Sequence, residues 1–291
     1  MSKVLINGVN LSYEITGQGI PLVWIHEFGG DKRSWDQQTR FFSRNFQVIT
    51  YNARGYPPSD VPNDVSAYSQ NQAVEDLRGL LSHLNIQQAY IGGLSMGGTT
   101  TLNFGIAYPE MAKGLIVAGA GTGSTNPKRL SKEANEFATS IERNGMDSWG
   151  SAYSEGPTRV QFRRKDPKGW QIFKEGVMGH SALGSAFTLR GVQAKRPSIF
   201  ALEHALSKLA VPTLILVGDE DDPCIDPAIF MKRTIPKSGL VVVPQTGHTI
   251  NLEEPDTFNR LTLEFILAVE AGRWGKRELT SGIGFLADED V

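Results

Sequence analysis

The pentapeptide Gly93-Leu94-Ser95-Met96-Gly97 constrains the fold of this 291-residue chain more than any other segment. A short apolar run at 89–91 precedes it, and a helical pattern over 96–108 follows it. A G-x-S-x-G pattern between a strand and a helix is typical of a nucleophile elbow, a sharp turn that holds a serine in a strained conformation above a sheet edge. The flanking glycines are needed because strand and helix approach too closely there for a Cβ atom.

Apolar runs alternate with helical patterns on both sides of this motif. Strands are expected at 9–15, 21–25, 46–51, 89–91, 115–118, 212–217 and 240–243, and helices at 74–84, 96–108 and after Pro255. Such alternation predicts an α/β fold with a mostly parallel central sheet and helices on both faces.

The alternation stops between residues 123 and 208, where the chain is more polar, mostly helical in pattern and dotted with aromatic residues. We therefore expect a core made of residues 1–122 and 209–271, a helical lid inserted at 123–208, and a C-terminal tail at 272–291. Three apolar residues of the tail, Trp274, Ile283 and Phe285, are candidates for a subunit contact in a homo-oligomer.

A carboxylate that could serve Ser95 follows a late strand. Gly218 is followed by an acidic loop in which a carboxylate can reach Nδ1 of a histidine and fix its tautomer. Asp221, three residues past Gly218, is the first choice for this role. Asp222 is the second choice and Asp219 the third.

The candidate general base is His248, which lies beside Gly247 just after the last expected strand. A glycine at this point allows a close turn over the sheet edge. The other histidines do not follow a late strand and are not candidates for the base; they are His26, His83, His180 and His204.

The whole chain resembles the α/β-hydrolase fold superfamily. The matching pieces are Trp24 to Gly30, Tyr51 to Gly55, the Ser95 elbow, Gly218 to Asp222, and Gly247-His248. The resemblance implies a Ser95-Asp221-His248 triad under a helical lid.

Acyl transfer also needs hydrogen-bond donors aimed at the developing negative charge. The amides of Met96 and Phe28 are the candidates for this oxyanion hole. The family often has His-Gly-x-Gly here, whereas this chain has His26-Glu27-Phe28-Gly29. Glu27 either turns away, to solvent or a basic residue, or lies near the site, where it would disfavour anionic acyl groups or position water or a cation. We expect it to shape acyl preference.

The expected function is a serine hydrolase that cleaves a small carboxylic ester through an acyl-enzyme on Ser95. The same triad serves lactone hydrolysis and the hydrolysis of a carbon–carbon bond in a vinylogous diketone, and amides are a weaker alternative. A non-catalytic small-ligand receptor, favoured only by Glu27, and cofactor-free redox or haloperoxide chemistry on the same scaffold are further hypotheses.

The lid is expected to decide the substrate. Its aromatic residues could line an apolar pocket. A basic cluster of Arg159, Arg163, Arg164, Lys165 and Lys168 either attracts a carboxylate or forms a solvated helix face, which is the favoured interpretation.

Composition narrows the partners to a small-molecule substrate. A net charge of −2 argues against nucleic acid, and the apolar runs are too short to span a membrane. The lone Cys224 and the dispersed histidines do not form a set of metal ligands, so no metal is expected. The glycines around Ser95 do not match a dinucleotide-binding or phosphate-binding motif, so no cofactor is expected. No signal peptide is apparent, and the expected compartment is the cytoplasm.

Overall fold

A computed structural model describes residues 2–276 and contains an eight-stranded sheet in the order β1-β2-β4-β3-β5-β6-β7-β8. Strands β3 to β8 run parallel, and β1 and β2 are antiparallel to their neighbours. The strands are β1(Ser2–Ile6), β2(Val9–Thr16), β3(Ile20–Ile25), β4(Phe46–Tyr51), β5(Ala89–Leu94), β6(Ala112–Ala118), β7(Thr213–Gly218) and β8(Ser238–Val243). The predicted mostly parallel sheet is confirmed.

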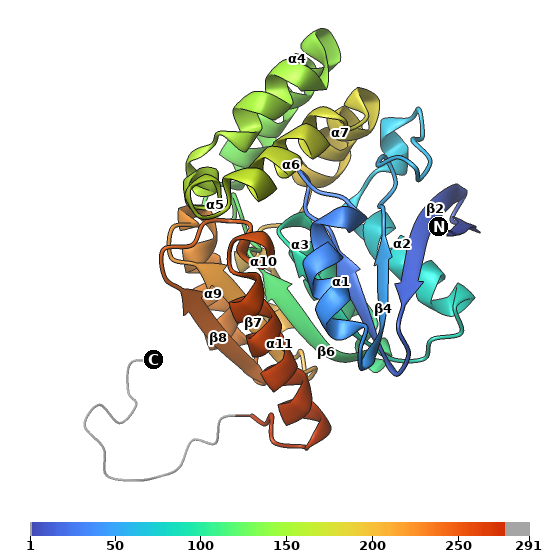
Figure 1. Ribbon diagram of the computed structural model, residues 1–291, viewed down its shortest axis with the longest axis vertical. Coiled ribbons are helices and arrows are strands. Elements are labelled where there is room, and N and C mark those ends of the chain that lie inside the picture. Colours follow the sequence, from blue (N-terminus) through green and yellow to red (C-terminus); the bar gives the residue numbers. More distant parts are fainter. Residues whose placement is uncertain (1, 277–291) are drawn as a thin grey trace.

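Helices cover both faces of this sheet, as predicted (Figure 1). Apolar side chains of α1(Asp36–Phe42) and α11(Pro255–Glu270) pack in one core layer, which α10(Ile250–Glu253) joins. Those of α2(Gln70–His83), α3(Met96–Ala107) and α9(Asp222–Thr234) pack in the other. Short 3-10 turns complete this part of the chain: η1(Lys32–Trp35), η2(Val65–Ala67) and η3(Pro109–Met111).

Two differences between the expected and the observed strands have a clear physical reason. The sequence pattern did not predict β1, because only Ile6 of its residues is buried and an edge strand of this kind shows no clear alternation. Strand β5 continues through Gly92 and Gly93, which we expected to end it. A Cβ atom on Gly92 would lie 2.1 Å from the ring of Trp24, so the glycine here makes room for the neighbouring strand's indole.

Between β6 and β7 the chain forms the helical region at the top of Figure 1. We call residues 127–193 of it the cap. Its elements are α4(Pro127–Ser154), η4(Pro157–Arg159), α5(Val160–Lys165), α6(Pro167–Met178), α7(Ala182–Thr188) and η5(Leu189–Gln193). The cap has an apolar cluster of its own, to which the core contributes Phe28, Tyr56, Tyr68 and Met96. The stretch that follows, with η6(Phe200–Leu202) and α8(Glu203–Leu206), places Leu206 in the core beside α9 instead.

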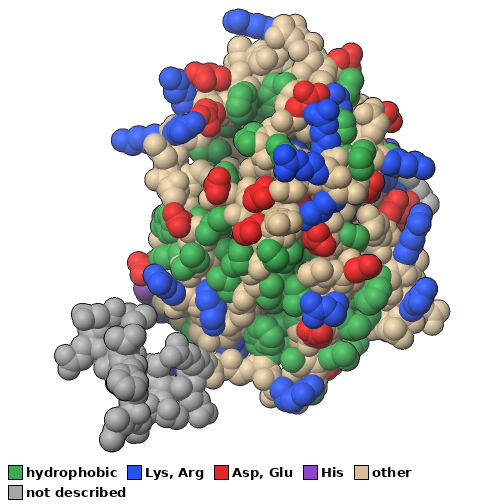
Figure 2. All heavy atoms as spheres, turned by 60° about the vertical axis from the view of Figure 1, so that its left-hand side comes forward, with side chains coloured by type: hydrophobic (Ala, Val, Ile, Leu, Met, Phe, Trp, Pro, Cys, Tyr) green, Lys and Arg blue, Asp and Glu red, His purple; other side chains and the backbone are tan. Residues whose placement is uncertain are grey.

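The surface charges, the tail residue Trp274 and the character of the helices concern the partners expected from the sequence. Acidic and basic side chains are interspersed over the face shown in Figure 2. Trp274 packs edge-on against Phe265, and its indole N–H donates to the carbonyl of Lys237 at 2.9 Å, so it contacts this chain's own core. Ile283 and Phe285 lie outside the described residues. Within residues 2–276, no helix combines the length and the apolar character that crossing a bilayer requires.

Candidate active site

Ser95 lies at the turn between β5 and α3 with φ 56° and ψ −111°, a conformation that side-chain-bearing residues rarely adopt. Its amide donates to the carbonyl of Ala118 at 2.8 Å. The glycines permit this turn: a Cβ on Gly93 would lie 2.3 Å from the Gly97 backbone, and one on Gly97 would lie 2.0 Å from the carbonyl oxygen of Ile25. This is the strained, closely packed turn that the motif predicted.

The loops after β7 and β8 bring an acid and a histidine together. Oδ2 of Asp221 lies 2.7 Å from Nδ1 of His248, and the two side chains are 1% and 8% exposed. Asp222 begins α9 and is exposed, and Asp219 is exposed and accepts from the amide of Thr246. Only Asp221 of the three aspartates contacts the imidazole.

The histidine loop is held from two sides. The buried carboxylate of Glu253 accepts from the amides of Gly247 and Thr249, at 2.8 and 3.1 Å. The amide of His248 donates to the carbonyl of Thr158, in the cap, at 2.9 Å. The position of the imidazole is therefore fixed jointly by core and cap.

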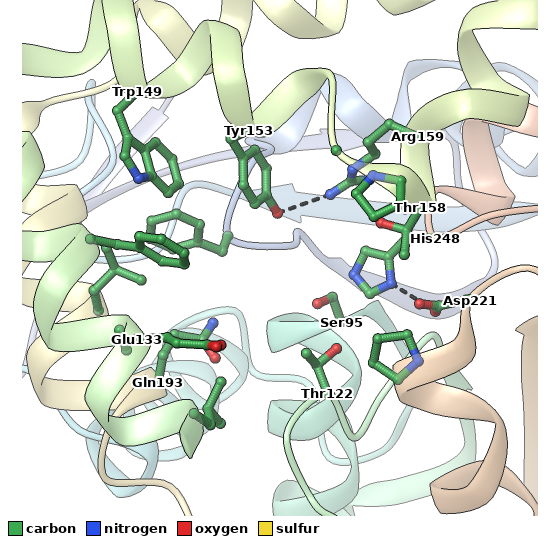
Figure 3. A pocket seen from close by; sticks show the side chains of 18 of the residues that line it. Ser95, Thr122, Glu133, Trp149, Tyr153, Thr158, Arg159, Gln193, Asp221 and His248 are labelled. Carbon is green, nitrogen blue, oxygen red and sulfur yellow. Dashed lines mark hydrogen bonds and ion pairs between the residues drawn. The ribbon is translucent and has the colours of Figure 1, made fainter. Parts of the chain in front are cut away.

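Ser95 and His248 face one cavity of about 310 Å³ between core and cap (Figure 3). No hydrogen bond joins the two side chains, a common situation without substrate. One wall is aromatic: Trp149 stacks on Tyr153, and Phe28 meets both edge-on. Polar groups lie elsewhere on the lining, among them Thr122, Glu133, Gln193 and Arg196. A small, largely apolar organic molecule with a few polar groups fits such a site.

The amides of Phe28 and Met96 donate no hydrogen bond to any described residue, and Met96 is the first residue of α3. His26 orients the Phe28 amide. Nε2 of His26 faces the amide of Ala53, which can only donate, so the proton is on Nδ1 and is given to the carbonyl of Glu27. The Glu27 carbonyl and the Phe28 N–H belong to the same trans peptide and point in opposite directions, so this hydrogen bond turns the Phe28 N–H away from His26. Burial lowers the pKa of His26, which keeps this neutral tautomer.

Glu27 does not line the cavity. It is 1% exposed, and both carboxylate oxygens accept from the guanidinium of Arg159, at 3.1 and 2.5 Å. Although burial alone would raise it, the charge of Arg159 holds the pKa of Glu27 below its ordinary value. The expected contact between Glu27 and substrate is therefore corrected: its charge is compensated inside the protein. Arg159, which we assigned to a solvated face, is 2% exposed.

Three metal-binding side chains lie together in the described part of the chain. Ligand atoms of Asp221, Cys224 and His248 are all within 4.8 Å of one another. They fit a metal poorly, because Asp221 and His248 already share a hydrogen bond and burial raises the pKa of the Cys224 thiol, which contacts the Gly119 carbonyl. A metal there would have to displace both a proton and the aspartate–histidine contact.

This fold and this site define a hydrolase-type scaffold, and the sequence agrees: the model of the alpha/beta hydrolase fold family matches residues 20–255. The chain belongs to the alpha/beta hydrolase fold family.

Individual relatives cover nearly the whole chain. The 3-oxoadipate enol-lactonase 1 of Acinetobacter baylyi is 27% identical over 267 residues, which cover 90% of this chain and 95% of that protein. A 2-hydroxy-6-oxononadienedioate/2-hydroxy-6-oxononatrienedioate hydrolase of Comamonas testosteroni is 24% identical over 269 residues, or 86% of this chain and 88% of that one. Among solved structures, a thermophilic esterase of Thermogutta terrifontis has a TM-score of 0.78 and 27% identity, covering 92% of this chain and 98% of that one.

Sequence reasoning missed three residues at the site. Arg159 was hidden in a basic run whose other members are exposed. Glu253 follows His248 closely in the chain, and a short loop ending in a carboxylate is the only signal that could have drawn attention to it. Arg196 lies in the segment Lys195-Arg196-Pro197, where no pattern distinguishes it from a surface cation.

Proposed function

We propose that this chain is a serine hydrolase that cleaves a small carboxylic ester through an acyl-enzyme on Ser95. The observation that carries the proposal is that a strained serine and a buried aspartate–histidine pair, from three separate loops, face the same small cavity.

In the proposed reaction His248 is the general base. Its Nδ1–H is held by Asp221, which leaves Nε2 to accept the proton of Ser95 as Oγ attacks the acyl carbon. The amides of Phe28 and Met96 stabilise the oxyanion, and the protonated imidazole gives its proton to the departing alkoxide. Water, deprotonated by His248, then attacks the acyl-enzyme and releases the acid, and Ser95 regains its proton.

A lactone is the second candidate substrate. It differs from an ester only in that the alkoxide stays attached to the acyl group, so the same residues carry out each step. Support comes from the enol-lactonase relative, the more similar of the two curated proteins compared. Carbon–carbon bond hydrolysis has support from the dienedioate hydrolase, which is 24% identical. The receptor alternative rested on Glu27, whose pairing with Arg159 removes the reason for it.

The test combines labelling with turnover. A fluorophosphonate probe should modify the wild-type protein and leave Ser95→Ala unmodified. A panel of aryl esters, lactones and a vinylogous diketone should then identify the substrate class, with Ser95→Ala slower by about 10⁴ to 10⁶ in kcat. Equal labelling or equal turnover of the two proteins would overturn the serine mechanism. Labelling of Ser95 without turnover of any substrate would favour a receptor.

A further inference from the structure

Four charged side chains line the cavity besides the imidazole, and three of them have a side-chain partner within the protein. Arg159 is paired with Glu27, Asp221 with His248, and Glu133 with Arg129 at 2.7 Å. The fourth, Arg196, has no ion-pair partner within 4.0 Å among the described residues. Arg196 is therefore the one charged side chain of the lining that contacts no oppositely charged group and no imidazole among the described residues.

Arg196 is anchored beside the nucleophile. One Nη donates to the carbonyl of Thr122 at 2.9 Å and the other to Oγ1 of Thr99 at 3.3 Å. Thr99 is one turn into α3, and its amide donates to the carbonyl of Ser95 at 2.8 Å. Figure 3 shows Thr122 next to Ser95 on the same side of the cavity. The guanidinium is thus held within a few side-chain lengths of the reacting centre.

The anchoring contacts leave donors for a ligand. A guanidinium has five N–H groups, and Arg196 uses only some of them. Its Nε donates to no described residue and is not among the fully enclosed atoms that lack a partner, so part of its surface is accessible, and Arg196 lines the cavity. Burial lowers the pKa of Arg196 to about 10, which still leaves it charged at neutral pH.

We propose that Arg196 forms an anion subsite and that the substrate has a carboxylate in addition to the bond that is cleaved. A half-buried guanidinium without a counter-ion is costly in the empty site, and a carboxylate would supply the missing charge through its planar pair of oxygens. The pairing of Glu27 with Arg159 removes the repulsion that the sequence alone suggested. This inference rests on the proposed function and narrows its substrate class.

The main experiment compares matched esters in wild type and Arg196→Gln. The first pair is 4-nitrophenyl hexanoate and mono-4-nitrophenyl adipate, which place no charge and one charge at the end of the acyl chain. The second pair is phenyl hexanoate and 4-carboxyphenyl hexanoate, which test the alcohol side. In one of the pairs, Arg196→Gln should lower kcat/KM for the charged ester about tenfold to a hundredfold and change the neutral ester much less. The affected pair identifies the half of the substrate that contains the carboxylate.

Two control variants separate an ionic contact from a structural role. Arg196→Lys keeps the charge and should restore part of the preference for the charged ester. Lys195→Gln removes an exposed neighbouring cation that does not line the cavity. In both pairs it should leave the ratio of kcat/KM for the charged ester to kcat/KM for the neutral ester unchanged. An equal loss on charged and neutral esters in both pairs would mean that Arg196 only holds Thr99 and Thr122. Unchanged ratios in both pairs would overturn the subsite.

A binding measurement keeps the inference testable if no ester is turned over. Adipate should bind to Ser95→Ala by calorimetry, and at least tenfold more weakly to the Ser95→Ala/Arg196→Gln double variant. High salt should reduce the difference, because the contact is ionic. Binding without turnover would overturn the proposed ester hydrolysis and leave the anion subsite standing. Equal binding to both proteins, or to neither, would overturn the subsite.

Discussion

Glu27 and Arg159 form a buried, two-pronged ion pair that joins the loop after β3 to the cap, across 132 positions of sequence. The hydroxyl of Tyr153 accepts from the same guanidinium at 2.9 Å. Glu27 immediately precedes Phe28, whose amide is a proposed oxyanion donor. The pair therefore fixes both the position of the cap and that of the loop with the proposed oxyanion donor.

Breaking this pair from either side should destabilise the protein. Glu27→Gln or Arg159→Met should each lower the free energy of unfolding by about 3 to 5 kcal/mol, because the remaining charge stays buried without its partner. The double variant should lose less than the sum of the two. Denaturant unfolding of the four proteins measures the coupling. Additive losses would show that the two charges contribute independently.

The acidic loop offers a comparison of adjacent residues. Asp221→Asn should lower kcat by about 10⁴, since an amide keeps the shape of the carboxylate but favours the wrong imidazole tautomer, as it does in a serine protease with the same triad. Asp222→Asn, at an exposed position, should stay within a few-fold of wild type. Steady-state kinetics with one ester checks both. If Asp222→Asn were the inactive variant, the triad acid would be misassigned.

The free energy of unfolding should fall in mild acid, because His180 is buried in its neutral form. Burial lowers the pKa of this histidine from 6.5 to about 4, so the unfolded chain takes up its proton first as the pH drops. The contribution of neutral His180 to the free energy of unfolding is complete above pH 6.5 and is lost between pH 6.5 and pH 4. The total loss is up to about 3 kcal/mol.

The check is the free energy of unfolding at several pH values over that window. His180→Gln should flatten the curve relative to wild type. His204→Gln, which removes an exposed histidine, should leave the curve unchanged. Parallel curves for wild type and His180→Gln would assign the acid sensitivity to other groups.

Gly97 should not tolerate a side chain. In Gly97→Ala the new Cβ would lie 2.0 Å from the carbonyl oxygen of Ile25 and 2.8 Å from that of His26. Both belong to the segment leading to Phe28, so we expect a stability loss of about 1 to 3 kcal/mol together with a reduced kcat. Thermal unfolding and ester kinetics measure the two effects. Gly275→Ala, which has nothing within 4 Å, is the matched control and should be silent in both.

Local patterns were sufficient for the parallel strands of the sheet and for the order of the site loops. Ser95, Asp221 and His248 could be chosen from the sequence because each follows a recognisable strand, and parallel strands end at the same edge. The partnership of Glu27 with Arg159 could not be foreseen, because it depends on how the cap is placed over the core. Arg196 was missed for the same reason: its lack of a partner becomes visible only when the contacts of the other charged side chains around the cavity are known.

The contact between the Thr158 carbonyl and the His248 amide has a consequence for protein engineering. Exchanging the cap for that of a relative would replace the residues that touch the histidine loop and Glu27, and not merely the walls of the cavity. A graft that omits Thr158 and Arg159 would leave a buried carboxylate unpaired and an amide of the base unsatisfied. The cap and the loops that contain Glu27 and His248 must therefore be transplanted as one unit.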